Sequence, residues 1–278
     1  MSFESFEESR YSGQPVTLYL FRYGSAANSF YAYTDAEQNF IYNGVEYEAI
    51  PIVRGAITAS GSLDKSTLSV EMPKTARLAE LFRIYPPSQV VTLVISQGHL
   101  NDGDVEFLAI WSGRVLSCAR EDNQAKFACE PVSTSMRRPG LRRNYQYGCP
   151  HVLYGDLCRA SMEAATYEAS VTAISGTVIT LASGWLADDL KPKLIGGMVR
   201  WTKPSGDTEL RTVMRRDGNN ITLAGLPFSL TAGADVELIL GCNHKMDDCQ
   251  NVHTNIHNFG GQPWIPTKNP IGTTNNFY

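Results

Sequence analysis

The sequence predicts an all-β protein with two β-domains of barrel or sandwich type, the second inserted in an irregular segment that carries cysteines. Three observations favour this fold class. Apolar residues make up 43% of the 278 residues, and a chain of this length can bury one large core or two ordinary ones. Strand-like runs recur at intervals of about 8–12 residues, which is typical of small barrels and sandwiches. One stretch alone has the apolar spacing of a helix.

Residues 1–132 are predicted to form the N-terminal β-domain. Residues 40–47 read as a hairpin, because the Asn43-Gly44 pair supplies the positive φ angles of a type I′ turn. The predicted helix covers residues 75–85 and is stopped by the two prolines that follow. Further strands are expected at residues 16–23, 66–72, 90–96, 105–111, 114–120 and 125–132.

Residues 167–240 are predicted to form the inserted small β-barrel-like domain. Two hairpins define it, one around Ser175-Gly176 and one around Asp217-Gly218. The flanking residues 133–166 and 241–278 have little periodicity and are rich in arginine, histidine, glycine and cysteine. We expect these two flanks to form one irregular segment, held together by the chemistry of its cysteines.

Charge and composition exclude several classes of protein. The net charge is −4 and 19% of residues are charged, which argues against a disordered chain and against a general nucleic-acid binder. The longest apolar run, residues 90–95, is far shorter than the roughly 20 residues of a spanning helix. The first ten residues are acidic and lack an apolar stretch. We therefore expect synthesis in a cytoplasm, where six cysteines indicate metal or cluster ligands more often than disulfides.

Four of the cysteines flank the inserted domain in two pairs. Cys149 and Cys158 have eight residues between them, and Cys242 and Cys249 have six. These intervals are long for zinc knuckles, although a structural zinc site remains open. A disulfide framework needs an oxidising compartment. An iron–sulfur cluster is wider than a zinc tetrahedron and suits longer intervals. Spacing alone leaves zinc and a cluster about equal.

The other candidate residues carry less chemistry. Cys118 and Cys129 fall on consecutive predicted strands, where a tight turn at Asn123-Gln124 would place them opposite each other as small buried apolar side chains. His99 is isolated. No nucleophile–base–orienter set is recognisable, so we do not expect an enzyme. Three further histidines crowd the second cysteine pair, where a mixed Cys/His zinc site could recruit them: His244, His253 and His257.

The cysteine layout and its surroundings resemble a known family. The residues that carry the resemblance are the run from Leu141 through Cys149-Pro-His to Cys158, the second pair Cys242 and Cys249, the closing run from Asn258 to Pro266, and the hairpin from Phe40 to Pro51. Together they are similar to the tail-tip, or baseplate hub, proteins of long-tailed bacteriophages. Hub proteins of gene transfer agents and phage lambda tail tip protein L belong with these.

The resemblance implies a [4Fe–4S] cluster bound by Cys149, Cys158, Cys242 and Cys249. Thr267 departs from the glycine that the family pattern leads us to expect. Nearby arginines could offset cluster charge, or they could be a solvated basic loop or contact neighbouring subunits. These arginines are Arg137, Arg138, Arg142, Arg143 and Arg159.

The implied function is that of a structural virion protein without catalytic activity. It would form the tail tip as a homo-oligomer, by resemblance a trimer, after assembly in the bacterial cytoplasm. Its partners would be the distal tail, tape measure and central fibre or receptor-binding proteins, with no sequence-specific nucleic-acid binding and no membrane span. The cluster would act as a structural clamp. The alternative is a zinc-binding virion or host-binding module.

Overall fold

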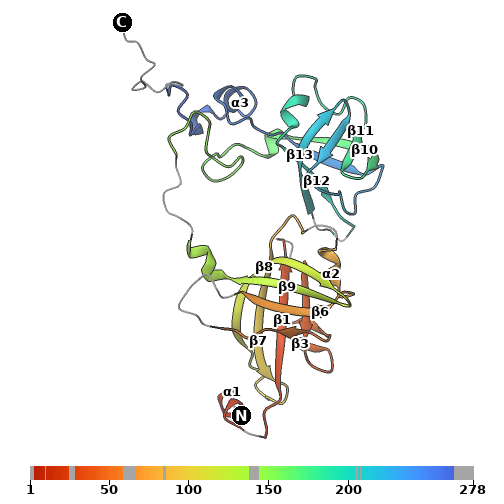
Figure 1. Ribbon diagram of the computed structural model, residues 1–278, viewed down its shortest axis with the longest axis vertical. Helices are drawn as coiled ribbons and strands as arrows, with labels where there is room; N and C mark the ends of the chain where they lie inside the picture. The colour runs from red at the N-terminus through yellow and green to blue at the C-terminus, as the bar shows by residue number, and fades with distance from the viewer. Residues whose placement is uncertain are drawn as a thin grey trace. The chain divides into compact units, whose positions relative to one another are not determined.

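The computed structural model describes residues 3–9, 11–24, 29–58, 67–83, 86–137, 144–204, 206 and 208–265. The chain divides into two compact units, Met1–Arg138 and Pro139–Tyr278. Strands make up most of the regular secondary structure of both (Figure 1), so the predicted all-β class is confirmed. The finer boundaries predicted near residues 132, 166 and 240 stay predictions.

The first unit contains one nine-stranded sheet, with the order β3-β4-β2-β1-β7-β8-β9-β6-β5. Its short helical elements are α1 (Phe3–Glu7), α2 (Arg77–Leu81) and the 3-10 turn η1 (Val132–Arg137). The strands are β1 (Pro15–Tyr23), β2 (Phe30–Thr34), β3 (Phe40–Tyr42), β4 (Val45–Ala49), β5 (Val53–Arg54), β6 (Leu68–Pro73), β7 (Val91–His99), β8 (Leu108–Glu121) and β9 (Gln124–Pro131).

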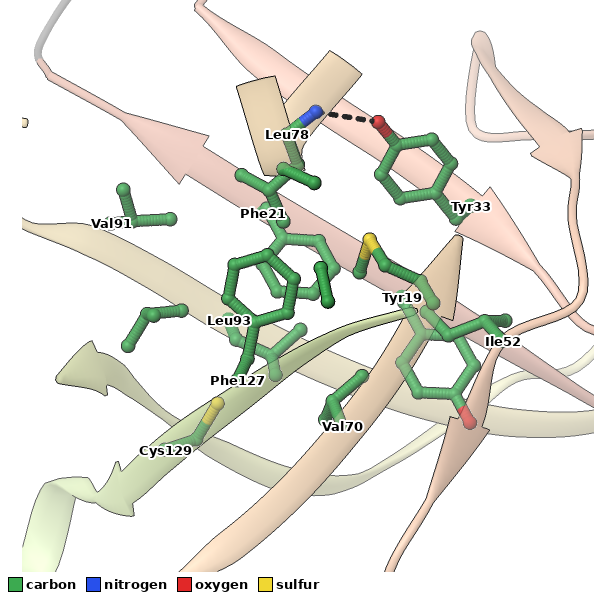
Figure 2. Close-up of a cluster of buried hydrophobic side chains, with 14 of the residues drawn as sticks. Tyr19, Phe21, Tyr33, Ile52, Val70, Leu78, Val91, Leu93, Phe127 and Cys129 are labelled. Atoms are coloured by element: carbon green, nitrogen blue, oxygen red, sulfur yellow. Dashed lines mark hydrogen bonds between the residues drawn. The ribbon is translucent and has the colours of Figure 1, made fainter. Parts of the chain in front are cut away.

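The main core of this unit lies on one face of the sheet. Alternate residues of β1 point into it, among them Phe21, which is fully buried. Figure 2 shows Phe21 close to Phe127 of β9, and their ring centroids are 6.3 Å apart. The Tyr33 hydroxyl accepts a hydrogen bond of 3.1 Å from the Leu78 amide and thereby fixes α2 over this core (Figure 2). Each such buried side chain contributes about 1.5–3 kcal/mol.

Three local predictions for this unit need comment. The hairpin at Asn43-Gly44 is confirmed, since both residues have positive φ between β3 and β4. The helix is shorter than predicted, because Ala76 provides no side-chain cap and Phe82 already leaves helical geometry; residues 84 and 85 lie outside the described part of the chain. The two strands predicted at 105–111 and 114–120 are one continuous strand, β8.

The predicted juxtaposition of Cys118 and Cys129 is wrong. Cys118 pairs with Phe127, and Cys129 pairs with Val115. The turn is centred one residue earlier than predicted, at Asp122-Asn123, and a bulge shifts the register of β8 between Val115 and Ser117. Cys129 is nevertheless fully buried, and Cys118 packs partly buried against the same core.

The second unit contains a closed six-stranded barrel with the order β10-β11-β14-β13-β12-β15. Both predicted hairpins are confirmed, β10 with β11 and β13 with β14. The strands are β10 (Thr166–Ser175), β11 (Val178–Leu181), β12 (Met198–Thr202), β13 (Thr208–Asp217), β14 (Asn220–Leu223) and β15 (Asp235–Ile239). The helical elements are η2 (Glu163–Ala165), η3 (Lys191–Leu194), α3 (Met246–Asn251) and η4 (Ile256–Asn258).

The first and last strands of the barrel are neighbours. Thr166 at the start of β10 pairs with Ile239 at the end of β15, and the Leu240 amide donates a hydrogen bond of 3.0 Å to the Ala165 carbonyl. Because these two strands pair, the chain segments that precede and follow the barrel leave it side by side. In Figure 1, α3 lies among the irregular loops that these flanks form. No helix in the described ranges is long and apolar enough to cross a membrane.

Candidate metal centre

Four cysteines from the two flanks of the barrel line one small cavity in the second unit. Cys149 and Cys158 reach it from the first flank, and Cys242 and Cys249 from the second. All six cysteines of the chain are free thiols in the structure. The remaining lining residues are His151, Leu153, His244, Lys245, His253, Asn255 and Asn258.

A reciprocal pair of hydrogen bonds joins the two cysteine loops. The Cys149 amide donates to the His244 carbonyl at 2.8 Å, and His244 Nδ1 donates to the Cys149 carbonyl at 3.0 Å. The His244 amide in turn donates to Cys242 Sγ at 3.3 Å. His244 thus contacts Cys149 of the first pair and Cys242 of the second pair and holds the two residues close together.

Asp248 organises the second loop. Its side chain is nearly fully buried, forms an ion pair with Lys193 Nζ, and accepts a hydrogen bond of 3.1 Å from the Asn243 amide. The Gly241 amide donates to the Lys193 carbonyl at 2.8 Å. Lys193 belongs to η3 of the barrel region, so this network attaches the second cysteine pair to the barrel. Residues 246–251 form α3, which carries Cys249.

The closing glycines allow the C-terminal segment to approach the first cysteine loop. A Cβ atom at Gly260 would lie 2.5 Å from the His151 ring, and one at Gly261 would lie 2.5 Å from the Tyr147 carbonyl oxygen. The close approach lets the Gly260 amide donate to Cys149 Sγ at 3.4 Å. His151 Nδ1 donates to the Asn258 carbonyl at 3.1 Å. Only glycine gives the backbone this access.

Backbone strain is concentrated around the cavity. Four non-glycine residues in or beside the loops have positive φ: Tyr154 at 61°, Arg159 at 56°, His244 at 58° and Thr254 at 48°. Such conformations are costly for residues with a Cβ atom and persist where the surroundings fix them. The fold therefore maintains strained loops to hold these thiols together.

The cavity favours the neutral forms of Cys242 and Cys249. Burial raises the pKa of Cys242, and negative charge on Asp248, Cys158 and Cys149 raises it further, against the opposing His244 amide. Burial and the other three cysteines together raise the pKa of Cys249 to about 11. Burial and the nearby thiols also raise the pKa of Tyr154. A set of four thiolates at this position needs a positively charged partner.

Amide donors are available for thiolate sulfur. Besides the donors from Gly260 and His244, the side chain of Asn255 donates to Cys158 Sγ at 3.6 Å. As the chain stands, no group of three or more His, Cys, Asp or Glu side chains among the described residues is arranged to hold a single metal ion. The four sulfurs therefore share a cavity and electrostatic coupling, without forming a preset single-ion site.

The histidines and arginines named from the sequence differ in their placement. His253 Nε2 donates to the Gly241 carbonyl at 3.0 Å, and its ring packs edge-on against Tyr154. His257 is exposed. Arg159 is exposed and donates to the Asp156 carbonyl at 3.1 Å. The side chains of the other four arginines, and Thr267, lie outside what the structure describes.

Sequence reasoning missed Asp248 and Asn255. Asp248 is one of two adjacent aspartates before Cys249, a common exposed pattern at a helix N-terminus. Asn255 lies in a polar run that predicts only a loop. The contacts of Asp248 with Lys193 and of Asn255 with Cys158 join distant parts of the chain, so no local pattern predicts them.

The fold and the site define an all-β protein. Its barrel unit carries four thiols in one cavity, where the chain enters and leaves the barrel. A profile of the family described as "Phage conserved hypothetical protein BR0599" matches residues 194–269. This range contains the second cysteine pair and the closing glycines.

Two further proteins are similar to this chain. An "Uncharacterized protein" of Xylella fastidiosa (strain 9a5c) is 24% identical over 165 residues, which cover 55% of this chain and 34% of that protein. The match thus spans about a third of that relative. A chain of the solved structure "Virion of native gene transfer agent (GTA) particle" superposes with a TM-score of 0.76, covering 99% of this chain and 97% of that chain at 16% identity. At this identity the likeness shows a shared fold.

Proposed function

We propose that this protein is a structural component of a phage-type tail tip, or baseplate hub, and that its four clustered cysteines bind a [4Fe–4S] cluster. The observation that carries the proposal is the convergence of Cys149, Cys158, Cys242 and Cys249 on one cavity. The full-length fold match to a chain of a gene transfer agent virion supports the virion assignment, as does the phage family match over residues 194–269.

The donor chemistry of the site suits an iron–sulfur cluster. Four thiolates are the usual ligands of [4Fe–4S] clusters, and hydrogen bonds to their sulfurs tune such centres. A zinc tetrahedron would need the sulfurs roughly 3.8 Å apart, given its usual Zn–S distance. A [4Fe–4S] cluster is a wider inorganic core, and the four thiols that line one cavity supply its usual ligand set.

A cluster at this position would act as a clamp. It would join the two flanks of the barrel and close a loop of about 90 residues, removing about 4–5 kcal/mol of chain entropy from the unfolded state by the argument used for disulfides. The same cross-link would fix the strained loops, whose surface is then available to neighbouring subunits. The partners on this account are the distal tail, tape measure and central fibre or receptor-binding proteins, in a homo-oligomer that is a trimer.

The second candidate function is a zinc-binding virion or host-binding module. Its support is the histidines that line the cavity with the thiols, of which His253 keeps a buried Nδ1 atom with no partner in the described structure. A mixed Cys/His set at this position would bind one metal ion and no sulfide.

Metal and sulfide analysis of protein purified without oxygen separates the two. The cluster proposal predicts a brown protein with iron and acid-labile sulfide near four each per chain. A colourless protein with one zinc per chain would replace the cluster proposal with the second candidate.

Immunogold labelling of purified particles tests the virion role. Label confined to the distal end of the tail supports a tail tip, and unlabelled particles would exclude it.

A further inference from the structure

Asn255 connects both cysteine pairs through three of its four polar groups. Its side chain contacts Cys158 of the first pair, and its backbone contacts Cys249 of the second pair. The residue is 7% exposed, although asparagine is usually found at the surface. A buried amide at such a position needs a full set of partners.

The Asn255 side chain is held in one orientation. Its Nδ2 donates to the Cys158 carbonyl at 2.5 Å and to Cys158 Sγ at 3.6 Å. Its Oδ1 accepts a hydrogen bond of 2.6 Å from Asn258 Nδ2. Because the Cys158 carbonyl can only accept, the amide N–H groups of Asn255 face Cys158 and its amide oxygen faces Asn258.

The Asn255 backbone forms two hydrogen bonds with Cys249 of the second pair. Its amide donates to the Cys249 carbonyl at 2.8 Å, and its carbonyl accepts from Cys249 Sγ at 3.2 Å. The strained φ of 48° at the preceding Thr254 places both groups toward Cys249. The Cys249 thiol can make this bond only while protonated, so ligation of a metal would release it, whereas the bond to Cys158 Sγ strengthens when that sulfur is an anion.

We propose that Asn255 is the positioning residue of the thiolate site: its side chain donates the N–H···S hydrogen bond that orients Cys158, and its backbone amide holds the Cys249 carbonyl beside it. This inference rests on the proposed metal-binding function and names the residue on which metal retention depends. Outer donors of this kind change metal affinity by about 10–100-fold when removed.

The test uses the full chain, purified metal-free without oxygen, with Co²⁺ as the probe. The Asn255→Asp variant keeps the shape of the side chain and removes both N–H donors. We expect its Co²⁺ affinity to fall by about 10–100-fold. We also expect the sulfur-to-cobalt charge-transfer band of the saturated variant to move to longer wavelength, because a sulfur without a donor is more electron-rich. Loss of packing alone would not move the band at saturation.

Asn243→Asp is the matched control. Asn243 lies in the same loops and its Oδ1 accepts from the Lys245 amide at 2.8 Å, which aspartate can also do, so we expect affinity within about twofold of wild type. If Asn255→Asp does not fold, Asn258→Asp carries the test, because it removes the donor that orients the Asn255 amide. It should weaken Co²⁺ binding and shift the band in the same direction.

The outcomes separate this inference from the cluster proposal. If wild type takes up iron and sulfide and the Asn255→Asp variant matches it in affinity and spectrum, the role of Asn255 is refuted and the cluster stands. If wild type binds Co²⁺ with the expected variant effects but takes up no iron and sulfide, the role of Asn255 stands and the cluster is refuted. If wild type binds neither, both are refuted.

Discussion

Cys149 and His244 exchange two hydrogen bonds across 95 positions of sequence, from the Cys149 amide to the His244 carbonyl and from His244 Nδ1 to the Cys149 carbonyl. This pairing exists because β10 and β15 are neighbours in the barrel. The closed barrel therefore places the two flanks together, and the flanks place the thiols together. Substitutions that disturb the contact between the two flanks should therefore damage the thiol site.

Replacing a clustered cysteine should abolish iron binding. Cys149→Ser or Cys242→Ser removes one of four thiolates, and we expect iron per chain to fall to background and tip assembly to stop. Cys118→Ser is the control, because Cys118 lies in the sheet of the first unit, outside the cavity. The iron content of this variant should equal that of wild type. Equal iron content in all three variants would remove the ligand assignment.

Gly260→Ala should loosen the first cysteine. The added Cβ would lie 2.5 Å from the His151 ring, so the ring or the backbone must move and the donor to Cys149 Sγ is displaced. We expect about 1–3 kcal/mol lower unfolding free energy for the second unit, as for other overpacked sites, measured by urea titration. Gly148→Ala is the control in the same loop, since its Cβ would meet its nearest neighbour at an ordinary 3.4 Å. Equal stability of the two variants would contradict the requirement for glycine at position 260.

Asp248→Asn should detach the second loop from the barrel. It leaves Lys193 without its anionic partner, which at present raises the pKa of that amine. Because Asp248 is buried and Lys193 is one-third exposed, we expect a loss of about 1–3 kcal/mol. The control is Asp188→Asn, which breaks an ion pair with Lys191 in which the aspartate is 95% exposed; solvent screens such a pair, so we expect a much smaller loss. Thermal unfolding of both variants beside wild type measures the contrast, and similar losses would contradict it.

Alkaline pH should destabilise the first unit through Cys129. Burial raises the pKa of this thiol from 9.0 to about 12, so the folded state holds the proton more tightly than the unfolded state. The resulting stability is complete below pH 9 and is lost as the pH rises toward 12, by about 1.4 kcal/mol per pH unit for one proton.

The Cys129→Ala variant checks this pH dependence. It lacks the thiol, so its unfolding free energy between pH 9 and 10.5 should fall less steeply than that of wild type, even though a small cavity lowers its stability at pH 7. Urea titrations at both pH values give the two slopes. Identical slopes would show that Cys129 does not ionise on unfolding in this range.

Local chemistry made much of the fold predictable. The hairpin at Asn43-Gly44 depends on two adjacent residues that accept positive φ, so the sequence alone identifies it. The partner of Cys118 depends on a one-residue shift of the turn, and the partner of Cys129 depends also on a bulge near Val115. Neither feature has a clear sequence signal. A strand register amplifies such small errors, because each residue of slip changes the pairing along the whole ladder.

The site was predictable only in part. The four cysteines stand out by type and spacing, and the resemblance of their surroundings to a known family assigns them to one site. Asn255 and Asp248 have no comparable signal, since their partners, Cys158 and Lys193, lie far away in sequence. Buried polar residues that support a site gain their meaning from tertiary contacts, which composition and periodicity do not encode.

Native mass spectrometry under anaerobic conditions tests the central claim most directly. Wild-type protein should carry a single adduct with the mass of four iron and four sulfide, and the Cys149→Ser and Cys242→Ser variants should lose it together. A chain that carries one zinc, or no adduct after reconstitution with iron and sulfide, would contradict the account.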